Sequence, residues 1–236
     1  MSHSFGFVED TLREADFFLD HLRDSKRHSF DAKCFFSAFV SAARNVTFAM
    51  QASLKGVEGF DEWYDDNVSR RLKTDSLAPY FKEFRNNVIH KGINPLNQVP
   101  LEHLRDLFRQ SHHHAHSHVL VFPSMPEQNA SSITDAVQAC TIYLSSLVSI
   151  VHDCYQKFKT IVDPKWYFTE ENFAAMNRTF EDAVVELGFP KIWAACAPSG
   201  TAAWEVLRSQ QPACQINDIF KKYLGKTILS PDELLF

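Results

Sequence analysis

Apolar residues recur every three or four positions along most of the chain, which is the repeat of an amphipathic α-helix. The first such pattern covers residues 8–23, the second covers residues 31–55, and a shorter one runs from Phe60 to about residue 73. Further helical patterns cover residues 77–91, 101–109, 132–161, 169–187, 202–209 and 216–224. The sequence therefore predicts an all-α protein, an up-and-down helical bundle.

Residues 111–126 are the least helical part of the pattern, and the apolar run Val119 to Phe122 predicts a short strand within a loop. Ser132 is expected to cap the long helix that follows, since its hydroxyl can accept from a free backbone N–H. Thr169 and Gly188 are expected to begin and end the helix over residues 169–187.

Asp163-Pro164 is the expected domain boundary, because proline interrupts the helical pattern at that point. The predicted organisation is a helical bundle of residues 1–163 followed by a small helical C-terminal extension of residues 164–236.

Composition narrows the class of protein. Glycine is scarce, with seven residues, and phenylalanine is abundant, with 21, which favours packed helices over turn-rich β-structure. The formal charge of −5 argues against a broad basic surface and limits any nucleic-acid contact to a local groove, for example at a dimer interface. The five cysteines contain no Cys-x-x-Cys pair, which indicates reduced thiols in a cytoplasmic protein.

The most apolar segment, residues 133–151, is interrupted by Asp135, Gln138 and several serines. It is typical of a buried helix rather than a membrane span. The first five residues lack the basic and apolar regions of a secretion signal, so neither export nor membrane insertion is expected.

The stretch from Phe81 to Gly92 combines an apolar helical stripe with charged and amide side chains. Such groups close to an apolar stripe indicate a candidate functional site. Arg85 and His90 are five residues apart, so on an unbroken helix their side chains leave the axis roughly 140° apart. We expect them to converge only if the helix ends near His90 or the arginine bends round. Gly92 is the expected stop. The stripe consists of Leu77, Phe81, Phe84 and Val88.

An arginine, an adjacent polar residue and a histidine four to six residues after the arginine form the pattern of the HEPN superfamily (higher eukaryotes and prokaryotes nucleotide-binding domains). Arg85, Asn86 and His90 match these three positions, so the chain resembles that family over residues 1–163 at most. The segment of residues 44–51 is also similar to the second helix of bacterial HEPN-like proteins.

This resemblance implies a homodimer in which two Arg-Asn-His sets meet in a shared cleft. In active members it implies a metal-independent endoribonuclease of the toxin or defence kind, without a cofactor. Two His90 side chains would divide the base and acid roles, Arg85 would neutralise the phosphate, and Asn86 would hold the histidine or the phosphate. Supporting or RNA-binding roles are expected for Glu83, Asn87, Lys91 and Arg44.

Other interpretations stay open at this point. Arg85 can simply pair with a carboxylate such as Glu83, while His90 caps the helix. The competing function is a non-enzymatic helical interaction module that binds a partner protein or a nucleotide, and a nuclease of this kind can also have a neutralising protein. The pair Trp63-Tyr64 is assigned to packing.

A cluster of histidines also suggests a metal site. Alternate residues would share one face of a strand, and residues four apart would share one face of a helix. No cysteine or clear carboxylate ligand lies nearby, so we predict a solvated loop and no metal. The residues considered as ligands are His112, His114, His116 and His118.

Overall fold

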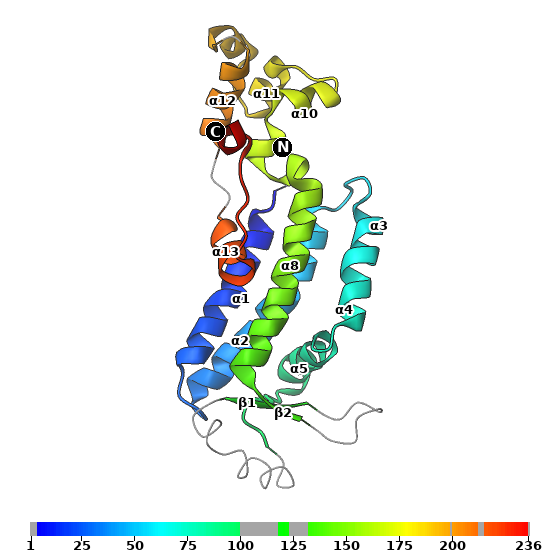
Figure 1. Cartoon of the computed structure of the whole chain (residues 1–236), viewed down its shortest axis with the longest axis vertical. Helices are drawn as coiled ribbons and strands as arrows, with labels where there is room; N and C mark the ends of the chain where they lie inside the picture. Colours follow the sequence, from blue (N-terminus) through cyan, green and yellow to red (C-terminus); the bar gives the residue numbers. More distant parts are fainter. Residues whose placement is uncertain (1–3, 100–117, 123–131, 199, 212–214, 236) are drawn as a thin grey trace.

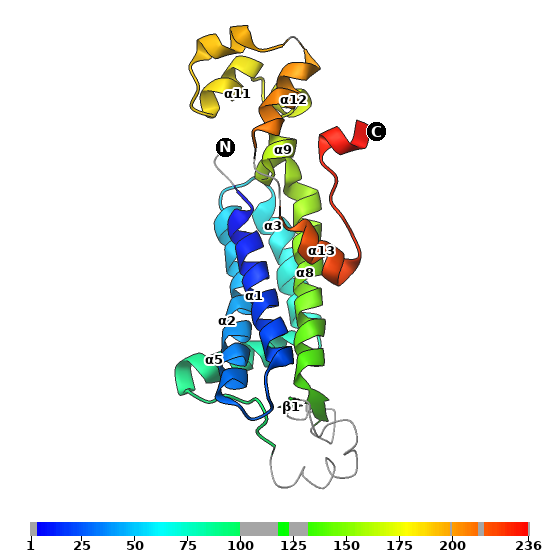
Figure 2. The same cartoon turned by 90° about the vertical axis from the view of Figure 1, so that its left-hand side faces the viewer.

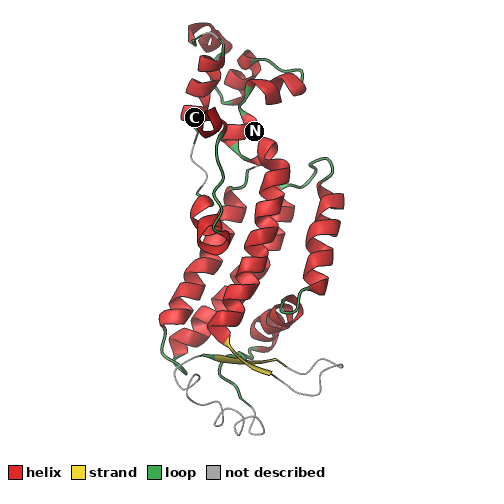
Figure 3. Ribbon diagram, in the orientation of Figure 1, coloured by secondary structure: helices red, strands yellow, loops and turns green. Residues whose placement is uncertain are grey.

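A computed structural model describes the protein over residues 4–99, 118–122, 132–198, 200–211 and 215–235. Helices form most of the regular structure in these residues, with a small two-stranded sheet at one end (Figure 3). Long helical segments run alternately up and down the long axis (Figure 1). They are α1 (Gly6–Asp24), α2 (Phe30–Ser53), the consecutive α3, η1 and α4 (Phe60–Tyr64, Asp65–Ser69 and Arg70–Thr74), and α8 (Ala136–Val162). The predicted all-α class is confirmed.

Helices α1 and α2 begin and end within two residues of their predicted bounds. Ser29 caps α2 by accepting a hydrogen bond from the Ala32 N–H at 3.0 Å. The inward residues Leu12, Leu19 and Leu22 of α1 are fully buried, because the short link between the two helices folds them against each other.

The segment made of α3, η1 and α4 is helical from Phe60 to Thr74, as predicted, but it is not a uniform α-helix. Its middle, η1, is a π-helix. This irregularity was not predicted, because hydrophobic spacing over five residues does not distinguish a π-helical turn from an α-helical one.

Helix α5 (Ala78–Lys91) lies across the end of the bundle beside the sheet (Figures 1 and 2). The sheet pairs β1 (Val119–Phe122) with β2 (Ser132–Asp135) in antiparallel register. The rings of Phe84 and Phe122 lie 5.6 Å apart and connect α5 to this sheet. The predicted strand is confirmed, while the helix predicted over residues 101–109 lies outside the described residues.

The predicted start of the long helix at Ser132 was wrong. Residues 132–135 form β2, whose backbone groups pair with β1, and α8 begins only at Ala136. Asp135 caps α8 by accepting from the Gln138 N–H at 2.8 Å. The Asp135 carboxylate thus accepts from a free backbone N–H in the first turn of the helix, while Ser132 belongs to β2.

The chain after Val162 forms short helices rather than long ones. The prediction of a single helix over residues 169–187 was wrong, because α10 ends at Ala175, Asn177 has a positive φ of 55°, and Thr179 opens a new helix through a capping box with Asp182. The predicted cap at Thr169 is confirmed by its bond to the Asn172 N–H. The elements are α9 (Pro164–Tyr167), α10 (Glu170–Ala175), α11 (Phe180–Glu186), η2 (Lys191–Cys196), α12 (Thr201–Ser209), α13 (Asn217–Leu224) and η3 (Pro231–Leu235).

Packing divides the segment after residue 163 between two hydrophobic clusters. Phe168, Phe173 and Trp204 belong to a small cluster of their own, while Phe220 of α13 is buried in the core of the bundle. Lys222 of α13 also bonds Asp16 of α1 at 2.6 Å. The domain boundary at residue 163 stays a prediction, with α13 returning to the bundle. In the described chain no helix has the length and apolar character needed to cross a membrane.

His118 ties the start of β1 to the turn between α1 and α2. The side chain is 3% exposed. Its Nε2 lies 3.1 Å from the Ser25 carbonyl oxygen, and its Nδ1 lies 3.2 Å from the Asn97 Nδ2. Because the amide nitrogen can only donate, Nδ1 accepts and Nε2 carries the proton. Both ring nitrogens are therefore used in structural hydrogen bonds.

We expect His118→Ala to lower the free energy of unfolding by about 1–3 kcal/mol, because it leaves buried polar partners unsatisfied. Urea denaturation measures this change. His90→Ala is the matched control, since His90 is exposed and should change stability by less than about 0.5 kcal/mol. Equal stability of the two variants would contradict the structural role of His118.

Candidate functional site

The apolar stripe of α5 packs as predicted and determines which residues face outward. Phe81 and Phe84 are buried, and Leu77 and Val88 are partly buried against the same core. The Phe81 ring stacks on Tyr143 of α8, with centroids 4.3 Å apart and an interplanar angle of 5°. The residues between these anchors are therefore presented toward solvent.

Helix α5 ends beside His90, as the sequence predicted. Gly92 has a φ of 66°, in the left-handed region that glycine adopts without steric cost. The Gly92 and Ile93 N–H groups both donate to the Asn87 carbonyl, which closes the last turn. His90 thus lies in the final turn of the helix, with Lys91 as its last residue.

The structure brings Arg85 and His90 together. Arg85 Nη1 lies 3.3 Å from His90 Nε2, because the arginine bends along the exposed face of the helix. A guanidinium has no acceptor, so Nε2 accepts in this contact and the ring is the neutral tautomer with its proton on Nδ1. The buried Arg85 Nε has no hydrogen-bond partner within the described residues.

The other predicted residues of the site are neighbours of this pair in the chain, but their side chains do not bond to Arg85 or His90 in the described residues. Glu83 and Lys91 are exposed, and Asn86 and Asn87 are half-buried. Over the described ranges, none of these four side chains forms a hydrogen bond or an ion pair. A purely structural role of Arg85 would have paired it with a carboxylate such as Glu83. Glu83 does not form that pair.

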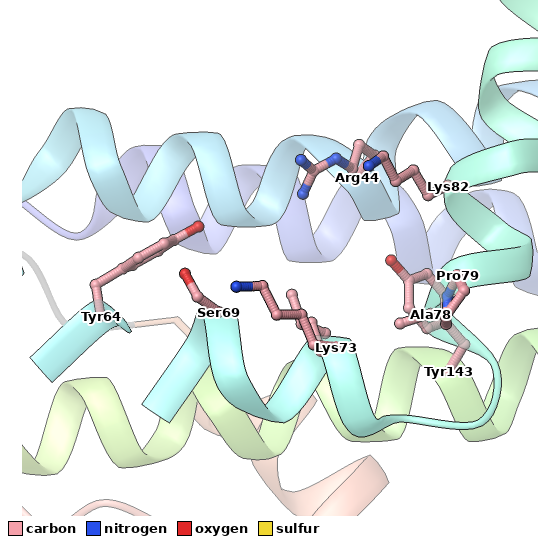
Figure 4. Close-up of a pocket in the computed structure, with 9 residues that line it drawn as sticks. Arg44, Tyr64, Ser69, Lys73, Ala78, Pro79, Lys82 and Tyr143 are labelled. Atoms are coloured by element: carbon pink, nitrogen blue, oxygen red, sulfur yellow. The ribbon is translucent and has the colours of Figure 1, made fainter. Parts of the chain in front are cut away.

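Arg44 lies on α2 and lines a cavity, and its expected supporting role in RNA binding stays a prediction. The cavity has a volume of about 370 Å³ and lies between α2, the consecutive elements α3, η1 and α4, and the helices α5 and α8 (Figure 4). The remaining lining residues are Tyr64, Ser69, Leu72, Lys73, Ala78, Pro79, Lys82 and Tyr143. Lys82 precedes Arg85 by three positions, so the cavity and the Arg85/His90 pair occupy neighbouring parts of α5.

Most of this cavity has no signal in the sequence. Lys73, Lys82 and Tyr143 come from three different helices, and no local motif connects them. Tyr64 was assigned to packing. Its neighbour Trp63 does pack on Phe158, with ring centroids 5.7 Å apart, whereas Tyr64 also faces the cavity.

The candidate metal ligands do not form a described site. His118 is buried and uses both ring nitrogens within the fold. His112, His114 and His116 lie outside the described residues. In the part of the chain that is described, no group of three or more His, Cys, Asp or Glu side chains is arranged to hold a metal ion.

Comparison with known proteins gives little further information. No protein-family model matches the chain, and no solved structure matches it. A stretch of 54 residues is 37% identical to protein Ea47 of Escherichia phage lambda. This stretch is 23% of the chain but only 13% of the phage protein, so the chain spans a small part of that relative. The HEPN resemblance stays a prediction.

The end of α5 can be tested through Gly92. Gly92→Ala should lower the free energy of unfolding by about 1 kcal/mol, because alanine is strained at a φ of 66° although its Cβ would meet no atom within 4 Å. Gly6→Ala is the control, since Gly6 has no positive φ and should tolerate the change. A neutral Gly92→Ala in urea denaturation would show that this helix end is not fixed by the glycine.

Proposed function

We propose that the protein is an RNA-directed, HEPN-like ribonuclease of the toxin or defence kind that acts in the cytoplasm without a metal ion. The observation that carries this proposal is the 3.3 Å contact between Arg85 Nη1 and His90 Nε2 at the exposed end of a helix. A cation and an imidazole in contact are the groups that phosphodiester transesterification uses.

The neutral tautomer of His90 suits the first step of this reaction. When RNA displaces the guanidinium from Nε2, that nitrogen becomes free to remove the proton of a ribose 2′-hydroxyl. The 2′-oxygen attacks the adjacent phosphorus, the bond to the 5′-oxygen breaks, and a 2′,3′-cyclic phosphate forms. Arg85, released from the histidine, stabilises the added negative charge on the phosphorane with its fork of donors.

The second proton transfer supports a homodimer. The leaving 5′-oxygen needs a proton, and after the first step His90 of one subunit carries the proton it has taken. If two copies of α5 met across a two-fold axis, the partner's His90, after taking a proton from solvent, would donate it to the leaving oxygen at once. In this proposal Asn86, which follows Arg85 in the chain and is half-buried, would hold either the histidine or a phosphate oxygen.

We expect Arg85→Ala and His90→Ala each to reduce RNA cleavage in excess EDTA by at least about 100-fold, because each removes a group that acts in the transition state. Cleavage of a labelled RNA of mixed structure, with analysis of the product ends, measures this. Arg70→Ala is the matched control, since Arg70 is exposed on α4 and its guanidinium pairs with Asp66 at the surface. Thermal unfolding confirms that all three variants fold.

Cleavage that survives both substitutions would assign the activity to another site or to a contaminant. A loss in Arg70→Ala as large as in the two site variants would indicate a general effect of surface charge. If the native protein cuts no RNA, the nuclease proposal fails.

A second candidate function, protein binding, is favoured by exposed apolar side chains on and around α11 and η2, where Phe189 and Trp193 form a stacked pair and Ile192 is the neighbour of Trp193 in the chain. The Phe189 and Trp193 rings stack with centroids 5.0 Å apart, yet they are 40% and 54% exposed, and Ile192 is 73% exposed. Exposed apolar patches mark contact surfaces. The first partner to test is a second copy of the chain.

We expect the double variant Ile192→Ser/Trp193→Ser to shift a dimer to monomer in analytical ultracentrifugation if these apolar side chains form the dimer contact. Phe7→Ser, at a residue that is 58% exposed on α1, is the control for loss of an isolated apolar side chain. A dimer that persists in the double variant would assign dimerisation to another surface, such as the exposed face of α5.

A further inference from the structure

The cavity beside α5 gathers positive charge without lining carboxylates. Arg44, Lys73 and Lys82 come from three helices and line the same space, and among its described lining residues there is no aspartate or glutamate. Figure 4 shows Tyr64, Ser69 and Lys73 rising from one wall toward Arg44 on the opposite helix. Like charges gathered around one cavity repel one another, so an anion bound between them would be stabilised.

Arg44 is held in place by hydrogen bonding. Its Nη1 donates to Thr47 Oγ1 at 2.7 Å, and its guanidinium lies 4.6 Å from the centroid of the Phe48 ring. Burial raises the pKa of Tyr64, and a hydrogen bond to Thr47 together with the charge of Arg44 opposes that rise. The guanidinium therefore has a fixed place at the wall of the cavity, with further N–H donors left for a ligand.

Tyr143 adds a hydroxyl donor to the wall of the cavity. Its side chain is 4% exposed, and burial raises its pKa to about 12. Its ring is fixed by the stack on Phe81, and within the described residues its hydroxyl has no hydrogen-bond partner. Tyr143 lines the cavity, and its hydroxyl is not among the buried polar atoms that lack a partner in the described residues, so this donor opens into the cavity and can bond a group held there.

The backbone beside the cavity is also unusual. Tyr64 and Ser69 flank and close the π-helix η1, and both line the cavity. π-helical turns are rare, and they occur frequently at functional sites. The irregular segment therefore brings two hydroxyl groups to the same space as the three cations.

Two carboxylates that act on the cavity tyrosines, Asp65 and Asp75, are hydrogen-bonded within the fold. Asp75 accepts from the Leu77 and Ala78 N–H groups, both at 2.8 Å, and from the Ser146 hydroxyl at 3.0 Å. Asp65 accepts from the Ser69 hydroxyl at 3.3 Å. Neither carboxylate is among the residues that line the cavity.

We propose that this cavity binds a small phosphomonoester. The phosphate would lie between Arg44, Lys73 and Lys82 and accept from the Tyr143 hydroxyl, since a phosphomonoester carries close to two negative charges near neutral pH and offers three acceptor oxygens. The apolar wall formed by Leu72 and Ala78 would contact the rest of the molecule. A volume of about 370 Å³ suits a small ligand. This site requires neither Arg85 nor His90 and goes beyond the proposed function.

Isothermal titration calorimetry with phenyl phosphate is the direct test, with inorganic phosphate and phenol as the two halves of the probe. We expect one saturable site for phenyl phosphate, weaker binding of inorganic phosphate and no binding of phenol. The double variant Lys73→Gln/Lys82→Gln should weaken phenyl phosphate binding by about tenfold or more, since it removes two charged donors. Lys55→Gln/Lys157→Gln removes the same charge at exposed sites away from the cavity and should change binding less than about twofold.

Tyr143→Phe separates binding from folding. It removes only the hydroxyl and keeps the stack on Phe81, so the thermal midpoint should stay the same or rise while phenyl phosphate binding weakens by about threefold or more. Arg85→Ala and His90→Ala should bind phenyl phosphate like the native protein. Normal binding by these two variants would show that the phosphomonoester site is independent of the ribonuclease site. Either proposal could then fail without the other.

Three results would overturn the proposal. Phenyl phosphate that shows no saturable binding removes the site. An equal loss in the two lysine double variants would mean that the probe responds only to overall charge. A short RNA that binds in a manner dependent on Lys73 and Lys82, while phenyl phosphate does not bind, would assign the cavity to RNA.

Discussion

The parallel contact between Phe81 and Tyr143 fixes the position of α5 on the bundle, and both candidate sites depend on that position. With ring centroids 4.3 Å apart, the stack joins the middle of α5 to α8 at a point that is almost fully buried. On one side of it, Lys82 reaches the cavity that Arg44 lines. Farther along the same helix, Arg85 and His90 meet at the exposed end. A change in this packing would therefore alter both sites together.

The apolar repeat predicts helices well where one face of a helix is buried over its whole length. Phe81 and Phe84 are buried as their spacing requires, and Gly92 ends the helix because only glycine enters the left-handed region without cost. The same repeat cannot detect competition between local structures. Residues 132–135 have a pattern that continues into α8, yet their backbone groups pair with β1. At Asn177 the backbone turns although the apolar repeat continues.

The two candidate sites differ in how far sequence can predict them. Arg85 and His90 are close in sequence and share one helix, so their contact depends only on the end of that helix and on the bend of one long side chain. The cavity joins Arg44, Lys73 and Tyr143 across the bundle, and its shape depends on a π-helical segment. Such a site is determined by tertiary packing, which no local pattern encodes.

The central claim is that His90 removes a proton from the 2′-hydroxyl of RNA while Arg85 stabilises the phosphate. The most direct test incubates two synthetic strands of the same sequence with the native protein in EDTA. One strand is RNA, and in the other every 2′-hydroxyl is replaced by hydrogen. The account predicts that only the RNA is cut and that its products carry 2′,3′-cyclic phosphate ends. Equal cleavage of the deoxy strand would contradict it, because that strand has no internal nucleophile for His90 to activate.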